Sequence, residues 1–154
     1  MKTRFILALL LPLTMPVAAF ADAGHDEDRA YGEPGDPKKP ARTVLITMKE
    51  GEQKMQFLPS EVKIRKGEQI KFVIRNNGLL DHEIVIATLE ENLKHAEEMA
   101  KNPDMEHDDP NARRLEPKKS GEIVWKFTKA GEFDFSCLLP GHREAGMFGK
   151  IVVR

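Results

Sequence analysis

The stretch Phe133-Asp134-Phe135-Ser136-Cys137-Leu138-Leu139-Pro140-Gly141-His142-Arg143-Glu144-Ala145-Gly146-Met147 joins a strand pattern to three evenly spaced side chains that bind metals. It holds the only cysteine of the sequence, and His142 and Met147 follow Cys137 at successive five-residue steps. Side chains alternate between the two faces of a strand, so the phenylalanines share a face with Cys137, whose sulfur then lies at the end of an apolar strand. The chain loops through His142 and Met147 before another strand-like run at 148–153. One loop therefore presents three candidate metal ligands.

The types of these ligands indicate the metal. Thiolate, imidazole and thioether are soft or borderline donors, and two histidines, a cysteine and a weak axial methionine form the type 1 copper set. The second histidine is His82, which follows one strand-like run and opens the next. Taken singly, a buried cysteine, a core methionine or a histidine near a turn has an ordinary structural explanation. Taken together, they predict one copper site formed by His82, Cys137, His142 and Met147.

Short runs of alternating apolar and polar residues surround this stretch and predict the fold class. Gly, Pro and Asn residues separate the runs, as is typical of strands joined by tight turns. Seven or eight such strands in sequence predict an all-β protein, a Greek-key β-sandwich. The runs before the cysteine strand are 43–48, 54–58, 61–65, 69–75, 82–88 and a later run through Ile123, Trp125 and Phe127.

The ligand pattern resembles the cupredoxin family of small copper proteins. The resemblance rests on Cys137, His142 and Met147 at this spacing, with His82 upstream and a closing strand, and it covers about residues 42–154. It implies a cupredoxin-like sandwich that carries a redox-active mononuclear type 1 copper. The ligand loops and the insertion between them are most similar to the periplasmic copper-tolerance cupredoxins of the CopI type, often called green cupredoxins. Electron-carrying cupredoxins often have Asn after the first histidine, where this sequence has Glu83.

The insertion at 89–120 interrupts the strand pattern. Leu89, Leu93, Ala96 and Ala100 recur at helical spacing, which predicts an amphipathic helix at 89–101 docked on the sandwich. A polar run with two basic pairs follows the helix. A connection of this length inside a compact domain tends to be functional or mobile.

Further candidate metal ligands lie outside the main pattern. His95 and Met99 are one helical turn apart on the predicted helix. The simplest interpretation places Met99 at the edge of the core, His95 in solvent and the remaining candidates in polar segments. The alternative is a second, weaker copper site formed by His25, His95, Met99, Met105 and His107.

The N-terminal residues 1–21 have the pattern of a cleavable secretory signal. Basic residues precede an apolar run, and Ala19-Phe20-Ala21 has the small-x-small form of a cleavage site. This run is too short to span a bilayer, and no later stretch approaches the roughly 20 apolar residues that a span needs. The pattern predicts a periplasmic protein without membrane insertion. Metal ligation would protect the unpaired thiol of Cys137 in an oxidising compartment.

Residues 22–41 contain His25, three prolines, glycines and many charges. Such a composition buries too little apolar surface to order itself, so it predicts a flexible N-terminal arm. The cupredoxin domain is then expected at 42–154, as one unit with a single core.

Three functions remain after composition and motifs are considered. The sequence has 24 Lys and Arg against 25 Asp and Glu, a balance that argues against a nucleic-acid partner. It contains no nucleophile elbow, phosphate loop or paired-carboxylate motif, which argues against hydrolysis. The resemblance implies a copper-binding protein that serves copper tolerance. The alternatives are a one-electron carrier between periplasmic redox partner proteins and an oxidase of cuprous ions that uses a second surface copper.

Overall fold

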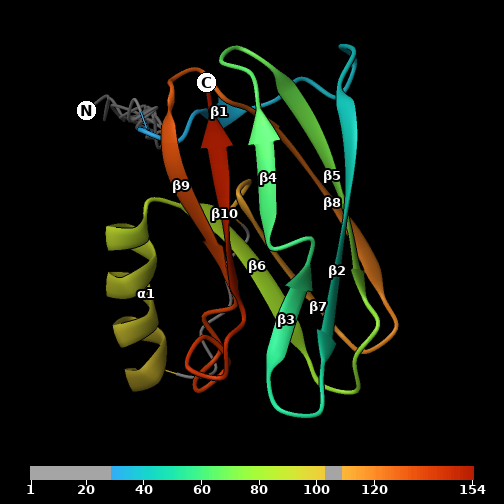
Figure 1. Cartoon of the computed structure of the whole chain (residues 1–154), viewed down its shortest axis with the longest axis vertical. Helices are drawn as coiled ribbons and strands as arrows, with labels where there is room; N and C mark the ends of the chain where they lie inside the picture. Colours follow the sequence, from blue (N-terminus) through green and yellow to red (C-terminus); the bar gives the residue numbers. More distant parts are fainter. Residues whose placement is uncertain (1–28, 103–108) are drawn as a thin grey trace, which may run out of the picture.

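Two β-sheets pack face to face, and one helix lies beside them (Figure 1). The computed structural model describes residues 29–102 and 109–154. The strand orders are β1-β8-β5-β2-β3 and β4-β10-β9-β6-β7. The pairs β2–β5 and β4–β10 are parallel, and the other pairs are antiparallel. The strands are β1 (Glu33–Pro34), β2 (Arg42–Glu50), β3 (Met55–Leu58), β4 (Glu61–Ile64), β5 (Gln69–Asn76), β6 (His82–Ala87), β7 (Ala112–Leu115), β8 (Ser120–Lys126), β9 (Gly131–Ser136) and β10 (Phe148–Val153).

The core lies between the two sheets because alternation turns one apolar face of each strand inward. In β5, Ile70, Phe72 and Ile74 are completely buried. Across the interface, the rings of Phe57 from β3 and Phe135 from β9 meet edge to face with centroids 5.1 Å apart. The predicted all-β sandwich is confirmed.

The predicted helix is confirmed as α1 (Leu89–Lys101). The Thr88 hydroxyl accepts a hydrogen bond from the Glu91 N–H, and the Glu91 carboxylate accepts one from the Thr88 N–H. This capping box satisfies two backbone donors that a helix start otherwise leaves without partners. The sequence Thr-x-x-Glu therefore sets where the helix begins.

The face that α1 packs on the sandwich differs from the predicted leucine stripe. Leu89 and Leu93 are 52% and 47% exposed, whereas Asn92 and Met99 are buried. The Asn92 side chain donates a 3.1 Å hydrogen bond to the Val85 carbonyl of β6. The prediction of a leucine face is wrong because this hydrogen bond turns Asn92, rather than the leucines, toward the sheet.

The segment 29–41, expected as part of a flexible arm, is attached to the sandwich. Tyr31 is buried and stacks on Trp125 with ring centroids 5.6 Å apart, and the Trp125 indole N–H donates to the Tyr31 carbonyl at 2.8 Å. The short strand β1 then pairs with β8. The prediction differs from the structure because it used the average composition of the segment. One buried aromatic side chain, Tyr31, is enough to attach the segment to the core. The predicted signal at 1–21 and residues 22–28 lie outside the described residues.

One strand, β7, was not predicted and lies where the sequence showed only a polar run. β7 forms inside the insertion and pairs antiparallel with β6, with His82 opposite Leu115. It covers the edge of β6 and completes the second sheet.

The described residues contain no helix with the length and apolar character that crossing a membrane requires.

Three connections meet at the lower end of the sandwich in Figure 1. They are the β2–β3 hairpin, the β5–β6 loop and the β9–β10 loop. The Met55 N–H donates to the Ala145 carbonyl at 2.9 Å, which ties the hairpin to the β9–β10 loop. This end of the molecule therefore gathers the two loops that carry the predicted ligands.

Candidate metal centre

His82, Cys137 and His142 come together at this end of the sandwich. His82 opens β6, Cys137 directly follows β9, and His142 lies in the loop after it. The Cys137 Sγ lies 3.3 Å from the His142 Nδ1, which lies 3.2 Å from the His82 Nδ1. The three donor atoms all lie within 4.8 Å of one another. His82 and Cys137 are completely buried, whereas His142 is partly exposed.

This arrangement fits a mononuclear copper ion. Nitrogen and sulfur donors about 2.0–2.3 Å from one ion, at near-tetrahedral angles, are roughly 3–4 Å apart. The observed separations of 3.2 and 3.3 Å meet that requirement. One thiolate with two imidazoles is also a donor set that copper prefers. Among residues 29–102 and 109–154, this is the one group of three or more His, Cys, Asp or Glu side chains close enough to hold an ion.

Met147 closes the same loop through its backbone. Its N–H donates to the His142 carbonyl at 3.0 Å, and its carbonyl accepts from the Cys137 N–H at 3.1 Å. Its side chain is completely buried. Gly141 and Gly146 have φ values of 84° and 96°, a region that glycine enters without steric cost, so the two turns of the loop depend on them. The role of Met147 as a fourth ligand stays a prediction.

Glu83 links the two ligand loops. Its N–H donates to the Cys137 Sγ at 3.4 Å, and its Oε1 accepts from the Leu138 N–H at 2.9 Å. The carboxylate thus makes a contact between the loops at the position where the resemblance places Asn. Burial raises the pKa of the Cys137 thiol to about 12, although the N–H of Glu83 acts in the opposite direction. The thiol therefore keeps its proton at neutral pH until a metal displaces it.

Glu50, at the end of β2, is a site residue that the sequence analysis missed. Its Oε1 lies 2.8 Å from the His82 Nε2, and its carboxylate also accepts from the N–H groups of Leu79 and Leu80. Burial acts to raise the pKa of Glu50, but these donors together outweigh it and lower the pKa to about 2. Glu50 lies 32 positions from His82 in a charged hairpin, and no feature of the sequence distinguishes it from its neighbours.

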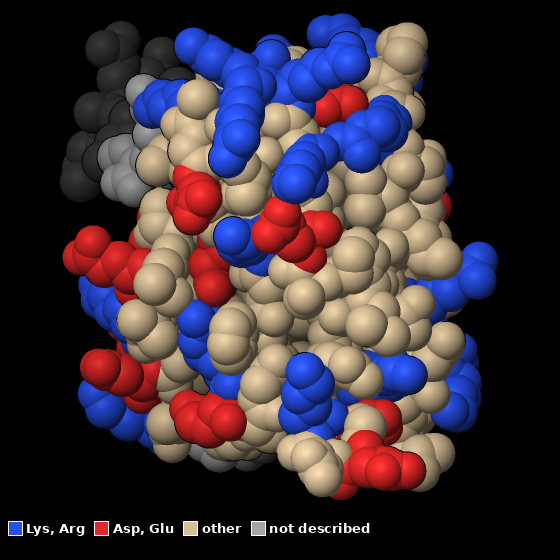
Figure 2. Space-filling model, in the orientation of Figure 1, with Lys and Arg blue, Asp and Glu red and all other residues tan. Residues whose placement is uncertain are grey.

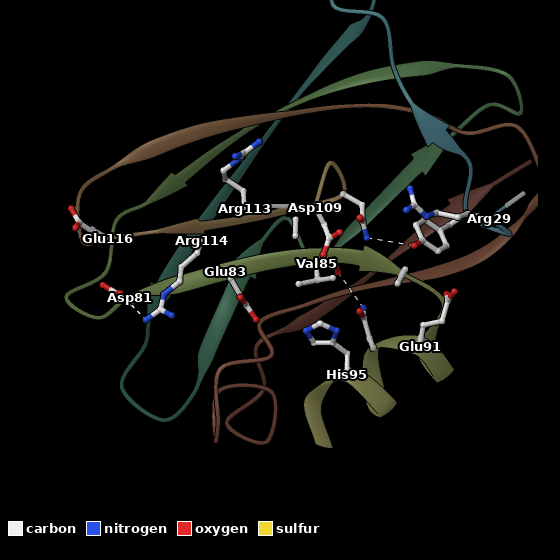
Figure 3. A pocket seen from close by; sticks show the side chains of 15 residues that line it. Arg29, Asp81, Glu83, Val85, Glu91, His95, Asp109, Arg113, Arg114 and Glu116 are labelled. Atoms are coloured by element: carbon white, nitrogen blue, oxygen red, sulfur yellow. Dashed lines mark hydrogen bonds and ion pairs between the residues drawn. The ribbon is translucent and has the colours of Figure 1, made fainter. Parts of the chain in front are cut away.

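The two other predicted ligands that the structure describes, His95 and Met99, do not join this group. Met99 is completely buried in the core, so the predicted packing role is confirmed for it. His95 projects from α1 toward Glu83 and Val85 in a polar cavity of about 510 Å³ (Figure 3). This cavity lies on the outer face of β6, since Glu83 and His82 alternate along the strand. His25, Met105 and His107 lie outside the described residues, and the second copper site stays a prediction.

Residues 43–154 match the family model described as copper binding proteins, plastocyanin/azurin family. The chain belongs to this family. Membership of the plastocyanin/azurin family agrees with the three metal-donor atoms that come together in the structure. His82, Cys137 and His142 provide the two-histidine, one-cysteine set of a type 1 copper site.

Individual proteins that are similar to this chain also have names that refer to copper. The chain is 46% identical to the copper-resistant cuproprotein CopI of Rubrivivax gelatinosus, and the match covers all of both proteins. It is 29% identical to the protein of the same name from Pseudomonas aeruginosa, with 98% of this chain and 97% of that protein covered. Among solved structures, reduced auracyanin from Roseiflexus castenholzii has a TM-score of 0.61 at 23% identity, and the match covers 75% of this chain and 99% of auracyanin. The auracyanin likeness shows the shared fold.

Proposed function

We propose that this protein serves copper tolerance in the periplasm by binding one copper ion through His82, Cys137, His142 and Met147. The observation that carries the proposal is the convergence of a thiol and two imidazoles within 4.8 Å at one end of the sandwich. The full-length similarity to copper-resistant CopI proteins supports the tolerance role. The secretory pattern of residues 1–21 supports the periplasmic location.

The proposed ligands have distinct tasks. Bound copper would supply one-electron redox chemistry at this position. The Cys137 sulfur and the His82 imidazole are enclosed, so they exclude water and present fixed donors. His142 is the partly exposed ligand and forms the edge of the site nearest to solvent. The Met147 thioether would be a weak fourth donor and would adjust the preference between the two copper oxidation states.

A copper-sensitive bacterial strain that lacks this gene tests the proposal. The wild-type gene is expected to restore growth in copper, whereas Cys137→Ser is expected to leave the strain sensitive because serine offers no thiolate. Equal amounts of both proteins in periplasmic extracts are the control for expression and export. A variant that lacks residues 1–21 is expected to stay in the cytoplasm and to give no protection. Full protection by Cys137→Ser would contradict the proposed role.

A second candidate function is supported by the surface of the β5–β6 loop. Leu79 and Leu80 are 78% and 46% exposed and lie three and two residues before the ligand His82. Exposed apolar side chains at a redox site fit the small, weak interfaces that electron-transfer proteins use. These two leucines favour a one-electron carrier that docks a periplasmic redox partner protein at this end.

The double variant Leu79→Ser/Leu80→Ser separates the two functions. Neither side chain is a proposed ligand, so the visible spectrum and the copper content are expected to stay unchanged. If the protein acts as a carrier, electron exchange with a soluble cytochrome c is expected to slow about tenfold, corresponding to about 1.4 kcal/mol. Unchanged exchange and unchanged copper tolerance would exclude this docking surface.

A further inference from the structure

We propose that Glu50 is a positioning residue of the copper site, which holds His82 in one tautomer and lowers the reduction potential of bound copper. The inference rests on the proposed copper-binding function and concerns a residue outside its ligand set. A carboxylate at this distance from a ligand imidazole affects both the orientation of the ring and its electron density.

The contacts of Glu50 determine the tautomer of His82. An ionised carboxylate accepts hydrogen bonds and donates none, so the proton of the His82 ring lies on Nε2, which is 2.8 Å from Glu50 Oε1. The other ring nitrogen then keeps a free lone pair. That atom is the Nδ1, which faces the His142 Nδ1 at 3.2 Å. Glu50 therefore leaves the inward nitrogen of His82 ready to bind a metal.

The carboxylate is itself held in a fixed place. The N–H of Leu80 donates to its Oε1 at 3.0 Å, and the N–H of Leu79 donates to its Oε2 at 2.9 Å. A Cβ added at Gly78 would lie only 2.5 Å from Glu50 Oε1, so the loop can approach the carboxylate this closely only with glycine there. The β5–β6 loop thus encloses the Glu50 carboxylate before the chain enters β6 at His82.

The position of this charge has an electrostatic consequence. The side chain of His82 is completely buried, and that of Glu50 is only 26% exposed. Water screens a charge poorly in such surroundings. A negative group that accepts a hydrogen bond from the His82 Nε2–H increases electron donation from the His82 Nδ1 to a metal. This donation stabilises Cu(II) more than Cu(I). The resulting reduction potential is lower than that of a site without the carboxylate.

Two variants of Glu50 and one matched control test the inference. Glu50→Gln removes the charge but keeps an oxygen that can accept from His82, whereas Glu50→Ala removes both. Glu52→Gln makes the same charge change two residues away, at an exposed position of the same hairpin. The reduction potential, the Cu(II) affinity and the visible spectrum are measured on copper-loaded protein, and nitrogen NMR of His82 reports the tautomer in copper-free protein.

Loss of a residue that hydrogen-bonds to a metal ligand typically lowers the metal affinity about 10- to 100-fold. We expect both Glu50 variants to lose Cu(II) affinity within this range and more than they lose Cu(I) affinity. Each tenfold loss of that preference raises a one-electron potential by about 59 mV. In copper-free Glu50→Ala, His82 is expected to show both tautomers, whereas the wild type and Glu52→Gln show the Nε2–H form alone.

Several results would overturn the role of Glu50. Potentials of both variants equal to that of Glu52→Gln would show that the contact with His82 does not affect the copper. A single unchanged tautomer in Glu50→Ala would show that the carboxylate does not orient the ring. Either result leaves the proposed function intact if wild-type protein binds one coloured copper, whereas absence of that copper in the wild type would overturn the function itself.

Discussion

Glu83, next to His82 in β6, contacts the β9–β10 loop with both its backbone and its side chain. Its backbone N–H points at the Cys137 sulfur, and its carboxylate receives the Leu138 N–H. Glu83 is 6% exposed, so the Leu138 N–H has little access to water as a substitute partner. At the scale of the residue, the position of the thiol depends on a side chain that is not a ligand.

The first prediction concerns this contact. Glu83→Ala leaves the N–H of Leu138 buried without its acceptor and is expected to lower the free energy of unfolding by about 2 kcal/mol. Glu83→Gln keeps an acceptor oxygen and is expected to cost less. Urea unfolding of the copper-free proteins measures both values. Equal losses in the two variants would show that the hydrogen bond is not the cause.

The second prediction concerns Met147. Met147→Leu keeps the Cys137 thiolate and both imidazoles, so the copper protein is expected to stay coloured. Removing a weak axial donor stabilises Cu(I) relative to Cu(II), and the reduction potential is expected to rise. Voltammetry of the variant and the wild type measures the change. A lowered potential would show that Met147 is not the axial ligand.

Residue chemistry explains why the ligands were predictable and Glu50 was not. Cys137, His142 and Met147 form a local pattern within one loop, and the predicted second histidine lies at a strand start. Glu50 acts only through its contact with His82, 32 positions away, and in the sequence it is one acid in a charged hairpin. A role created by a tertiary contact leaves no local signature.

At the scale of the elements, Asp134 connects α1 to the ligand loop. The Arg143 Nη1 and Nη2 donate to its two carboxylate oxygens at 2.9 and 3.2 Å, and the Asn92 side chain of α1 donates at 2.7 Å. Arg143 directly follows the ligand His142. Through Asp134, the inserted helix α1 is therefore connected to the loop that carries three of the proposed ligands.

The third prediction concerns this connection. Asp134 and Arg143 expose only 9% and 14% of their side chains. Asp134→Ala leaves a guanidinium with little access to solvent and no anionic partner, and is expected to cost about 3 kcal/mol of stability. Glu61→Ala is the matched control, because it breaks only exposed ion pairs, with Lys150 and Lys63, and is expected to cost much less. Thermal unfolding of copper-free protein compares them, and equal losses would show that Asp134 has no special role.

The fourth prediction concerns Tyr31 and the segment that it attaches. Burial raises the pKa of Tyr31 to about 12 from its ordinary value near 10. Above pH 10 the unfolded chain therefore releases this proton before the folded chain does, and the free energy of unfolding is expected to fall between pH 10 and pH 12. Unfolding followed across this range should show a shallower fall for Tyr31→Phe, which has no phenol. Parallel curves for the two proteins would contradict the assignment.

Element types were predictable from the sequence, but some partners of the elements were not. Thr88 and Glu91 mark the start of α1 in the sequence itself. The buried face of α1 depends instead on Asn92, whose hydrogen bonds reach β6 and β9. The short strand β7 exists because it pairs with β6, and its own four residues do not show an apolar alternation.

At the scale of the whole molecule, the charges are unevenly distributed. Lys and Arg side chains crowd the upper end of the face shown in Figure 2. The ligand loops lie at the lower end in the same orientation (Figure 1). On this face, the densest group of cations therefore lies away from the ligand loops.

The fifth prediction concerns the number of copper ions in the whole protein. We expect one tightly bound, coloured copper per chain, because the described residues hold one suitable group of His, Cys, Asp and Glu side chains. The triple variant His95→Ala/Met105→Leu/His107→Ala is expected to keep this ratio, and Met99 is left in place because it is part of the core. Metal analysis after dialysis gives the ratio. A second, colourless copper that only the wild type retains would establish the second site and favour the cuprous oxidase.

The order of the ligands along the chain has a consequence for export. His82 comes first, whereas Cys137, His142 and Met147 follow later in the sequence, in a loop that is closed when β10 pairs with β4 and β9. If the chain is exported from its N-terminus, as the pattern at 1–21 predicts, we expect His82 to cross the membrane before the other three ligands. The set of ligands stays incomplete until the loop that carries Cys137, His142 and Met147 has also passed and β10 has paired. We therefore expect the protein to bind its copper after export rather than before it.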